Sequence, residues 1–200
     1  MNFNIVTAVQ ERMGLTAFRK IDPNDASNTA ALSDDKGYYE QSAALAVLAG
    51  LYRYGSDPEG ALALTQPDRD TLLSTILHGR ESRIARTVSS IGAHSYESTL
   101  NFMKRVAVNA QDILHEQALG NNAGGAAAGS NVVNPAVNNE TSTIQHILVS
   151  QRHNILTYLP PEMQVGKVLK DNAMDDRTNK MEGPVSDLMH FFENIFASEK

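Results

Sequence analysis

An uncharged tract of Gly, Ala and Asn at residues 120–139 is the feature that most limits how this chain can fold. Its sequence, GNNAGGAAAGSNVVNPAVNN, has little apolar surface to bury and several residues that interrupt regular structure. Such a composition is typical of flexible connections. We therefore predict a helical domain at residues 1–119, a flexible linker at 120–139 and a C-terminal helical segment at 140–200.

Apolar residues on both sides of the tract recur at intervals of three and four, which is the period of an amphipathic α-helix. The predicted helices cover residues 3–18, 37–54, 67–78, 80–91 and 95–119 before the tract, and 141–159, 162–169 and 184–196 after it. No run of β-branched residues alternates with polar residues in the way of a strand. The sequence therefore predicts an all-α fold, a multihelical bundle with a long flexible connection.

Composition argues against several classes of protein. Without cysteine, the chain can form no disulfide, thiolate metal site or cysteine nucleophile, and we expect a cytoplasmic protein. No segment approaches the roughly 18 uninterrupted apolar residues of a membrane-spanning helix. The net charge is −6, with 11 basic and 14 acidic residues in 1–119 and 6 and 9 in 140–200. Nucleic acid is therefore an unexpected partner, because binding it requires a positive surface.

Two histidine–carboxylate pairs raise the question of a metal site. His78 and Glu81 are three residues apart, as are His94 and Glu97, so each pair could share one face of a helix. Di-iron bundles use the opposite order, Glu-x-x-His, together with further glutamates. Both pairs also fall at expected helix boundaries, where histidines are more often caps. We predict no metal and no other cofactor, and keep a metal-dependent enzyme built on these four residues as an alternative.

Three arginines recur at intervals of three residues: Arg80, Arg83 and Arg86. On a helix they form a stripe that could contact a phosphate or an acidic partner. The simpler interpretation is a solvated face, since nearby glutamates neutralise it and the whole chain is acidic. Binding of an anionic ligand through this stripe is therefore a second alternative.

The common catalytic motifs are absent from the sequence, which has no G-x-S-x-G, no P-loop and no G-x-G-x-x-G. We therefore predict a non-enzymatic protein that acts by protein–protein interaction or self-association. The segment after the tract has too few helices to bury its own apolar faces. It is expected to dock on the first part or on a partner chain, with Leu188, Phe192 and Phe196 of the last helix as the interface.

Two stretches resemble a known family. The first is residues 72–114, which include the junction ILHGRES at residues 76–82; the second combines Gln151, Ile155 and Leu159-Pro160. Both resemble segments of the bacterial YidB-like family of uncharacterised helical proteins, in which short helices repeat with an apolar-apolar-x-Gly-x-Glu-Ser junction. The resemblance implies a multihelical fold and supplies no catalytic residue for this chain.

Overall fold

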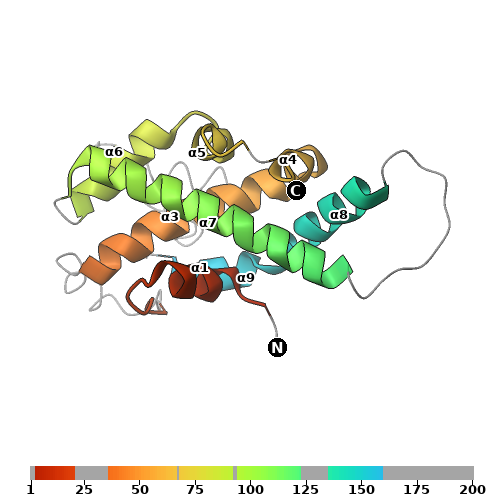
Figure 1. The fold of residues 1–200 in the computed structure, drawn as a ribbon. Coiled ribbons are helices and arrows are strands. Elements are labelled where there is room, and N and C mark those ends of the chain that lie inside the picture. Colours follow the sequence, from red (N-terminus) through yellow and green to blue (C-terminus); the bar gives the residue numbers. More distant parts are fainter. Residues whose placement is uncertain (1–2, 21–35, 67, 92–93, 123–134, 160–200) are drawn as a thin grey trace, which may run out of the picture.

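The computed structural model describes five stretches of the chain, which are residues 3–20, 36–66, 68–91, 94–122 and 135–159. Within them the backbone forms helices and no strand, and the helices pack together as a bundle (Figure 1). The predicted all-α, multihelical fold is therefore confirmed. The helices predicted at 162–169 and 184–196, and with them Leu188, Phe192 and Phe196, lie outside the described residues.

The helices differ widely in length. In chain order they are α1 (Ile5–Met13), α3 (Lys36–Gly55), α4 (Pro58–Leu64), α5 (Leu72–Ile76), α6 (Glu81–Ile91), α7 (Tyr96–Asn122), α8 (Pro135–Ser150) and α9 (Arg152–Tyr158). The two longest, α3 and α7, organise the rest, because each packs against most of the other elements.

Helix α3 is the centre of the bundle. Every residue from position 41 to position 52 is buried, which is expected for a helix that is apolar on all sides. It packs against α4, α5, α6, α7, α8 and α9. Close approach at its C-terminal end depends on glycine, because a Cβ on Gly60 of α4 would lie 1.8 Å from the carbonyl oxygen of Tyr54. The turn between α3 and α4 therefore tolerates no side chain at position 60.

Helix α7 lies across the bundle and contacts α1, α3, α5, α6 and α8 (Figure 1). Its apolar face, which includes Met103, Val106, Ala110 and Leu114, is buried as its periodicity predicts. The hydroxyl of Ser95 accepts a hydrogen bond from the Ser98 backbone N–H at 3.1 Å and caps the helix start. The helix thus presents one apolar side to the core and one polar side to its neighbours.

The predicted linker at 120–139 is too long at both ends. Helix α7 continues to Asn122, and α8 begins at Pro135, so that only residues 123–134 of the tract fall outside the described helices. Helix elongation is favourable once a core anchors one end, and proline is well tolerated in the first turn. The weak helix formers at either end of the tract therefore join helices that the core holds in place.

A single helix predicted over residues 141–159 is wrong, because it is broken at Gln151 into α8 and α9. The Gln151 side chain is only 3% exposed. Its Oε1 accepts a hydrogen bond from the Ile5 N–H at 3.0 Å, and its Nε2 donates to the Phe3 carbonyl at 3.2 Å. The chain turns at the residue whose side chain reaches the N-terminus, and α9 lies against α1 and α3.

Two helices are shorter in the structure than the sequence predicted. The helix predicted over residues 67–78 is reduced to α5, because the Asp68 carboxylate accepts hydrogen bonds from the Thr71 N–H and hydroxyl at 3.3 and 2.7 Å and forms a turn. The helix predicted over residues 3–18 ends at Met13, since Gly14 adopts a left-handed conformation with φ of 62°.

Candidate functional site

The four candidate metal ligands do not form a site. The His94 ring stacks on Tyr39 with centroids 3.8 Å apart, and the His78 ring packs edge-on against Tyr54 at 6.0 Å. Across the described parts of the chain, no three His, Asp or Glu side chains gather closely enough to hold a metal ion. These two histidines pack against aromatic rings instead.

The three arginines of the predicted stripe are all exposed, on and just before α6. The opposite side of this helix, which carries Ile84 and Val88, is buried. The Arg86 guanidinium carbon lies 5.7 Å from the centroid of the Tyr96 ring, and the Tyr96 hydroxyl donates to Ser82 at 3.0 Å. One member of the stripe is therefore held against an aromatic ring, which limits its motion.

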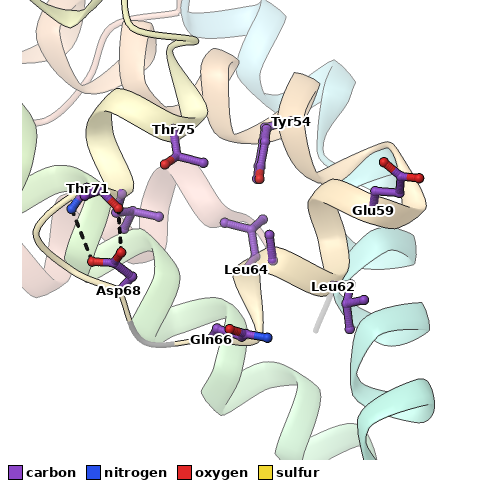
Figure 2. Close-up of a pocket in the computed structure, with 10 residues that line it drawn as sticks. Tyr54, Glu59, Leu62, Leu64, Gln66, Asp68, Thr71 and Thr75 are labelled. Carbon is purple, nitrogen blue, oxygen red and sulfur yellow. Dashed lines mark hydrogen bonds between the residues drawn. The ribbon is translucent and has the colours of Figure 1, made fainter.

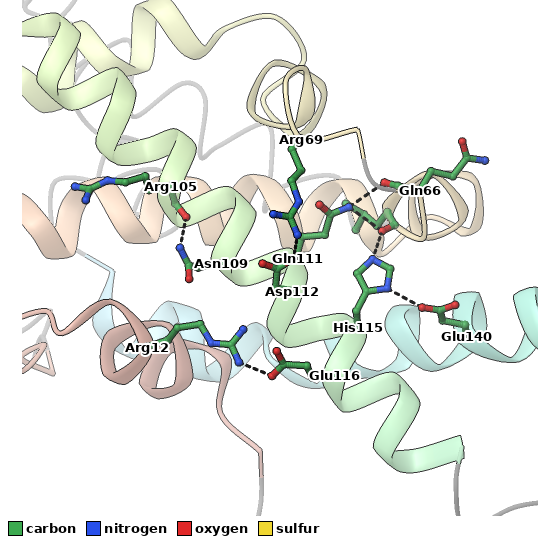
Figure 3. Close-up of polar contacts among 11 residues, drawn as sticks. Arg12, Gln66, Arg69, Arg105, Asn109, Gln111, Asp112, His115, Glu116 and Glu140 are labelled. Carbon is green, nitrogen blue, oxygen red and sulfur yellow. Dashed lines mark hydrogen bonds and ion pairs between the residues drawn. The ribbon is translucent and has the colours of Figure 1, made fainter.

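A cluster of polar side chains lies on α7, at Gln111, Asp112, His115 and Glu116 (Figure 3). None of these four residues belongs to a site predicted from the sequence. Gln111 is 2% exposed, and its Nε2 donates to the carbonyl oxygens of Leu64 and Gln66 at 3.0 and 3.1 Å. This amide therefore fastens the C-terminal end of α4, where the backbone has carbonyls without helical partners, to the middle of α7.

Two ion pairs flank the cluster. Arg69 donates to Asp112 at 2.9 Å, and Arg12 of α1 pairs with Glu116. The hydrogen bond to Glu116 raises the pKa of the Arg12 guanidinium above its ordinary value. All four side chains keep substantial contact with solvent, so each pair contributes no more than about 1 kcal/mol. Their main effect is to set which surfaces of α1 and of the segment before α5 face α7.

His115 stands between two acceptors (Figure 3). Its Nε2 lies 2.9 Å from the Leu64 carbonyl oxygen, and its Nδ1 lies 2.7 Å from Oε1 of Glu140 on α8. A carbonyl oxygen can only accept, so Nε2 carries a hydrogen. The contact with Glu140 then needs a second proton, either on Nδ1 or on the carboxyl group. One imidazole thus joins three helices, α4, α7 and α8.

The contact at Glu140 is part of a larger docking surface for α8. Ile144, Ile147 and Leu148 are buried where α8 meets α3, α4 and α7. Gln145 Nε2 donates to the Ser56 carbonyl oxygen at 2.8 Å just beyond the end of α3. The helices that follow the tract are therefore fixed to the helices that precede it by apolar burial and by directed polar contacts.

A separate hollow of about 330 Å³ opens between α4 and the segment that leads into α5 (Figure 2). Tyr54, Leu64, Asp68 and Thr71 are among the residues that line it. Hydrogen bonds from Thr71 lower the pKa of the Asp68 carboxyl below its ordinary value. That carboxylate already accepts the hydrogen bonds that shape the turn before α5.

No protein-family model, curated protein or solved structure matches this chain at a significant level. The resemblance to the YidB-like family therefore stays a prediction. Over the residues that the structure describes, no helix combines the length and the apolar character needed to cross a bilayer.

The residues that sequence reasoning missed share a recognisable signal. Gln111 and Gln151 are polar, yet they occupy positions on the apolar side of their segments. A glutamine on an otherwise apolar face indicates a buried amide that must find partners. The partners themselves, such as Glu140 for His115, could not be read from the sequence because they are brought together only by packing.

Proposed function

We propose that this chain acts by protein–protein contact, through self-association in which α8 and α9 of one copy dock on α3, α4 and α7 of another. The observation that carries the proposal is the docking of α8 and α9 on elements that precede the tract. Their covalent link to α7 is residues 123–134, a sequence of Gly, Ala, Asn and a few other small or apolar residues. The proposal assigns the chain no catalytic chemistry.

The burial of α8 is compatible with exchange between copies. Each large apolar side chain that α8 buries contributes about 1.5–3 kcal/mol. The same contacts form whether α8 belongs to the same chain or to a second one. The short covalent link between α7 and α8 favours the intramolecular arrangement, through an effective concentration in the millimolar range. Self-association is therefore expected to rise with protein concentration and to rise sharply when the connection is shortened.

The position of α8 beside α7 predicts what happens when the segment that joins the two helices is deleted. Helix α8 returns alongside the C-terminal part of α7, so the chain must reverse direction between Asn122 and Pro135 (Figure 1). Deletion of residues 123–134 removes the length needed for that reversal. We expect the deletion variant to form a dimer in which α8 docks on the partner, which is domain swapping.

Light scattering after size-exclusion chromatography measures the outcome, together with circular dichroism for helix content. The matched control replaces residues 123–134 by a Gly/Ser sequence of equal length and is expected to keep the oligomeric state of the parent. A deletion variant that stays monomeric and folded, or that loses its α8 contacts without dimerising, would contradict the proposal.

The last predicted helix offers a second contact for the same function. Its pattern places Leu188, Phe192 and Phe196 on one face, and we propose that this face binds a partner chain. Replacing the three by serine is expected to reduce self-association while the melting transition of the bundle persists. If the serine variant sediments like the parent chain over a wide concentration range, this face is not the interface.

An acidic polypeptide is a second candidate partner, favoured by the exposed stripe of Arg80, Arg83 and Arg86 and by the contact of Arg86 with Tyr96. Changing the three arginines to glutamine should abolish binding of a poly-glutamate peptide. The control is the same change at Lys104 and Arg105, which are exposed on α7. The acidic polypeptide is not a partner if binding is independent of salt and is unchanged in the variant of the three arginines.

A further inference from the structure

We propose that the hollow between α4 and the segment leading into α5 binds a small organic amine in its cationic form. Its volume is about 330 Å³, at the small end of the roughly 300–1,000 Å³ that is usual for ligand sites. It therefore suits a molecule with one charged end and a short apolar body. Binding there does not depend on self-association, because the described lining belongs to α3, α4, α5 and the turn before α5 of one chain.

The apolar part of the lining is fixed by the core. Leu64 and Leu72 are only 1% and 5% exposed, so their positions are set by packing. Leu62 lines the same hollow and is 43% exposed. Figure 2 shows Leu64 between Tyr54 on one side and Gln66 on the other. An apolar group placed beside these leucines shields Leu62 from water, which favours binding.

Four polar side chains in the lining are not used by the fold. The hydroxyls of Tyr54 and Thr75, the amide of Gln66 and the carboxylate of Glu59 form no hydrogen bond with any residue that the structure describes. They come from α3, α5 and the two ends of α4. A few polar groups that converge on an apolar surface are typical of a ligand site, because they fix the orientation of the ligand.

The charge of the hollow is negative. Glu59 and Asp68 both line it, neither forms an ion pair with a described residue, and no described lining residue is basic. Thr71 orients the Asp68 carboxylate through two hydrogen bonds, which keep it ionised. A carboxylate has about four acceptor sites, so Asp68 can accept further donors. The neighbouring Arg69 is engaged by Asp112 of α7.

A cationic amine fits this lining better than the other classes of ligand. Its ammonium group carries three N–H donors, which match the carboxylates and the oxygens of Thr75 and Gln66. The Tyr54 ring adds an aromatic group, and such rings attract cations. An anion would be repelled by both carboxylates, and a purely apolar molecule would cover charged groups without pairing them. A metal ion is disfavoured, since no three acidic or histidine side chains of the described residues gather there.

Three probes with the same phenethyl body separate these classes: phenethylammonium, the neutral phenethyl alcohol and the anionic hydrocinnamate. Each is titrated into the full chain while the backbone amide shifts of α4 and α5 are followed by NMR. The amine is expected to bind about tenfold more tightly than the alcohol, which corresponds to about 1.4 kcal/mol for the charged contacts. Hydrocinnamate should leave the shifts unchanged. Added salt should weaken binding of the amine.

Glu59→Gln tests the charge without disturbing the fold, because this carboxylate has no partner among the described residues. It should weaken binding of the amine about fivefold, or about 1 kcal/mol. Tyr54→Phe removes a hydroxyl that also has no such partner and should weaken binding by a smaller factor. The matched control is Glu97→Gln, an exposed carboxylate at the start of α7 that does not line the hollow. It should bind the amine like the parent chain.

The amine site is wrong if phenethyl alcohol or hydrocinnamate binds as tightly as phenethylammonium. It is also wrong if Glu59→Gln binds the amine like the parent chain, or if Glu97→Gln weakens binding to the same extent. These results are separate from those for self-association. If the chain without residues 123–134 stays monomeric while the parent chain binds the amine, self-association is wrong and the amine site stands.

Discussion

Gln151 and Ile5 are 146 positions apart, yet the Gln151 side-chain oxygen accepts a hydrogen bond from the Ile5 backbone N–H at 3.0 Å. The N–H belongs to the first turn of α1, where a helix has no internal acceptor. Two other glutamines have the same function, since Gln41 bonds the Arg19 and Tyr158 carbonyls and Gln111 bonds those of Leu64 and Gln66. Buried amides thus join segments that the apolar core alone would not position.

Replacing Gln151 by alanine should destabilise the fold by about 2–3 kcal/mol, because the first N–H of α1 and the Phe3 carbonyl would lose their partner in a buried place. Urea unfolding monitored by circular dichroism measures the change. Gln145→Ala is the matched control on α8, where a partly buried amide makes one bond to Ser56. It should cost about 1 kcal/mol. If the two variants lose the same free energy of unfolding, the Gln151 hydrogen bonds stabilise the fold no more than the single bond of Gln145.

Gly60→Ala should cost about 3 kcal/mol, because the new Cβ would lie 1.8 Å from the Tyr54 carbonyl oxygen, a backbone atom that cannot move aside. Gly55→Ala should cost less, since the atoms in its way are methyl groups at the ends of Leu148 and Leu64. Gly120→Ala is the control, with no atom within 4 Å, and should stabilise α7 slightly. Thermal melting of the three variants gives the ranking, and the reverse order would be inconsistent with this packing.

The Arg12–Glu116 pair should contribute little to stability. A double-mutant cycle with alanine at both positions is expected to give a coupling of about 0.5 kcal/mol, because both side chains keep contact with solvent. The coupling should shrink further at 1 M salt, where the screening length is about 3 Å. A salt-independent coupling above about 2 kcal/mol would mean that the pair is shielded from water.

Thr71→Val should raise the pKa of Asp68 towards its ordinary value of 3.8, because the Thr71 hydroxyl is the main group that lowers it. The lowered pKa means that the turn before α5 gains stability from the ionised carboxylate above the ordinary value. That gain is lost as the pH falls through the lowered value. Carboxyl carbon shifts in a pH titration by NMR measure the pKa. An unchanged pKa in the variant would assign the effect to the backbone bonds instead.

Periodicity alone was enough to predict the helices α3, α6 and α7. It placed the ends of several helices wrongly, because ends depend on single contacts. Asp68 bonded to Thr71 shortened α5, and Gln151 bonded to Ile5 divided the predicted helix at residues 141–159. The histidine–glutamate spacing suggested a metal site that the fold did not assemble, since residues close in sequence need not point toward a common centre.

The sequence by itself determined the class of the fold, because spacing of apolar residues is a local property that each helix carries along its own length. It also determined where the chain is interrupted, since Gly, Asn and Pro weaken helices wherever they occur. Only the tertiary structure decided that His115 meets Leu64 and Glu140, and that α8 returns to α4 and α7. Those contacts join residues far apart in the chain, so they exist only after the apolar faces have packed.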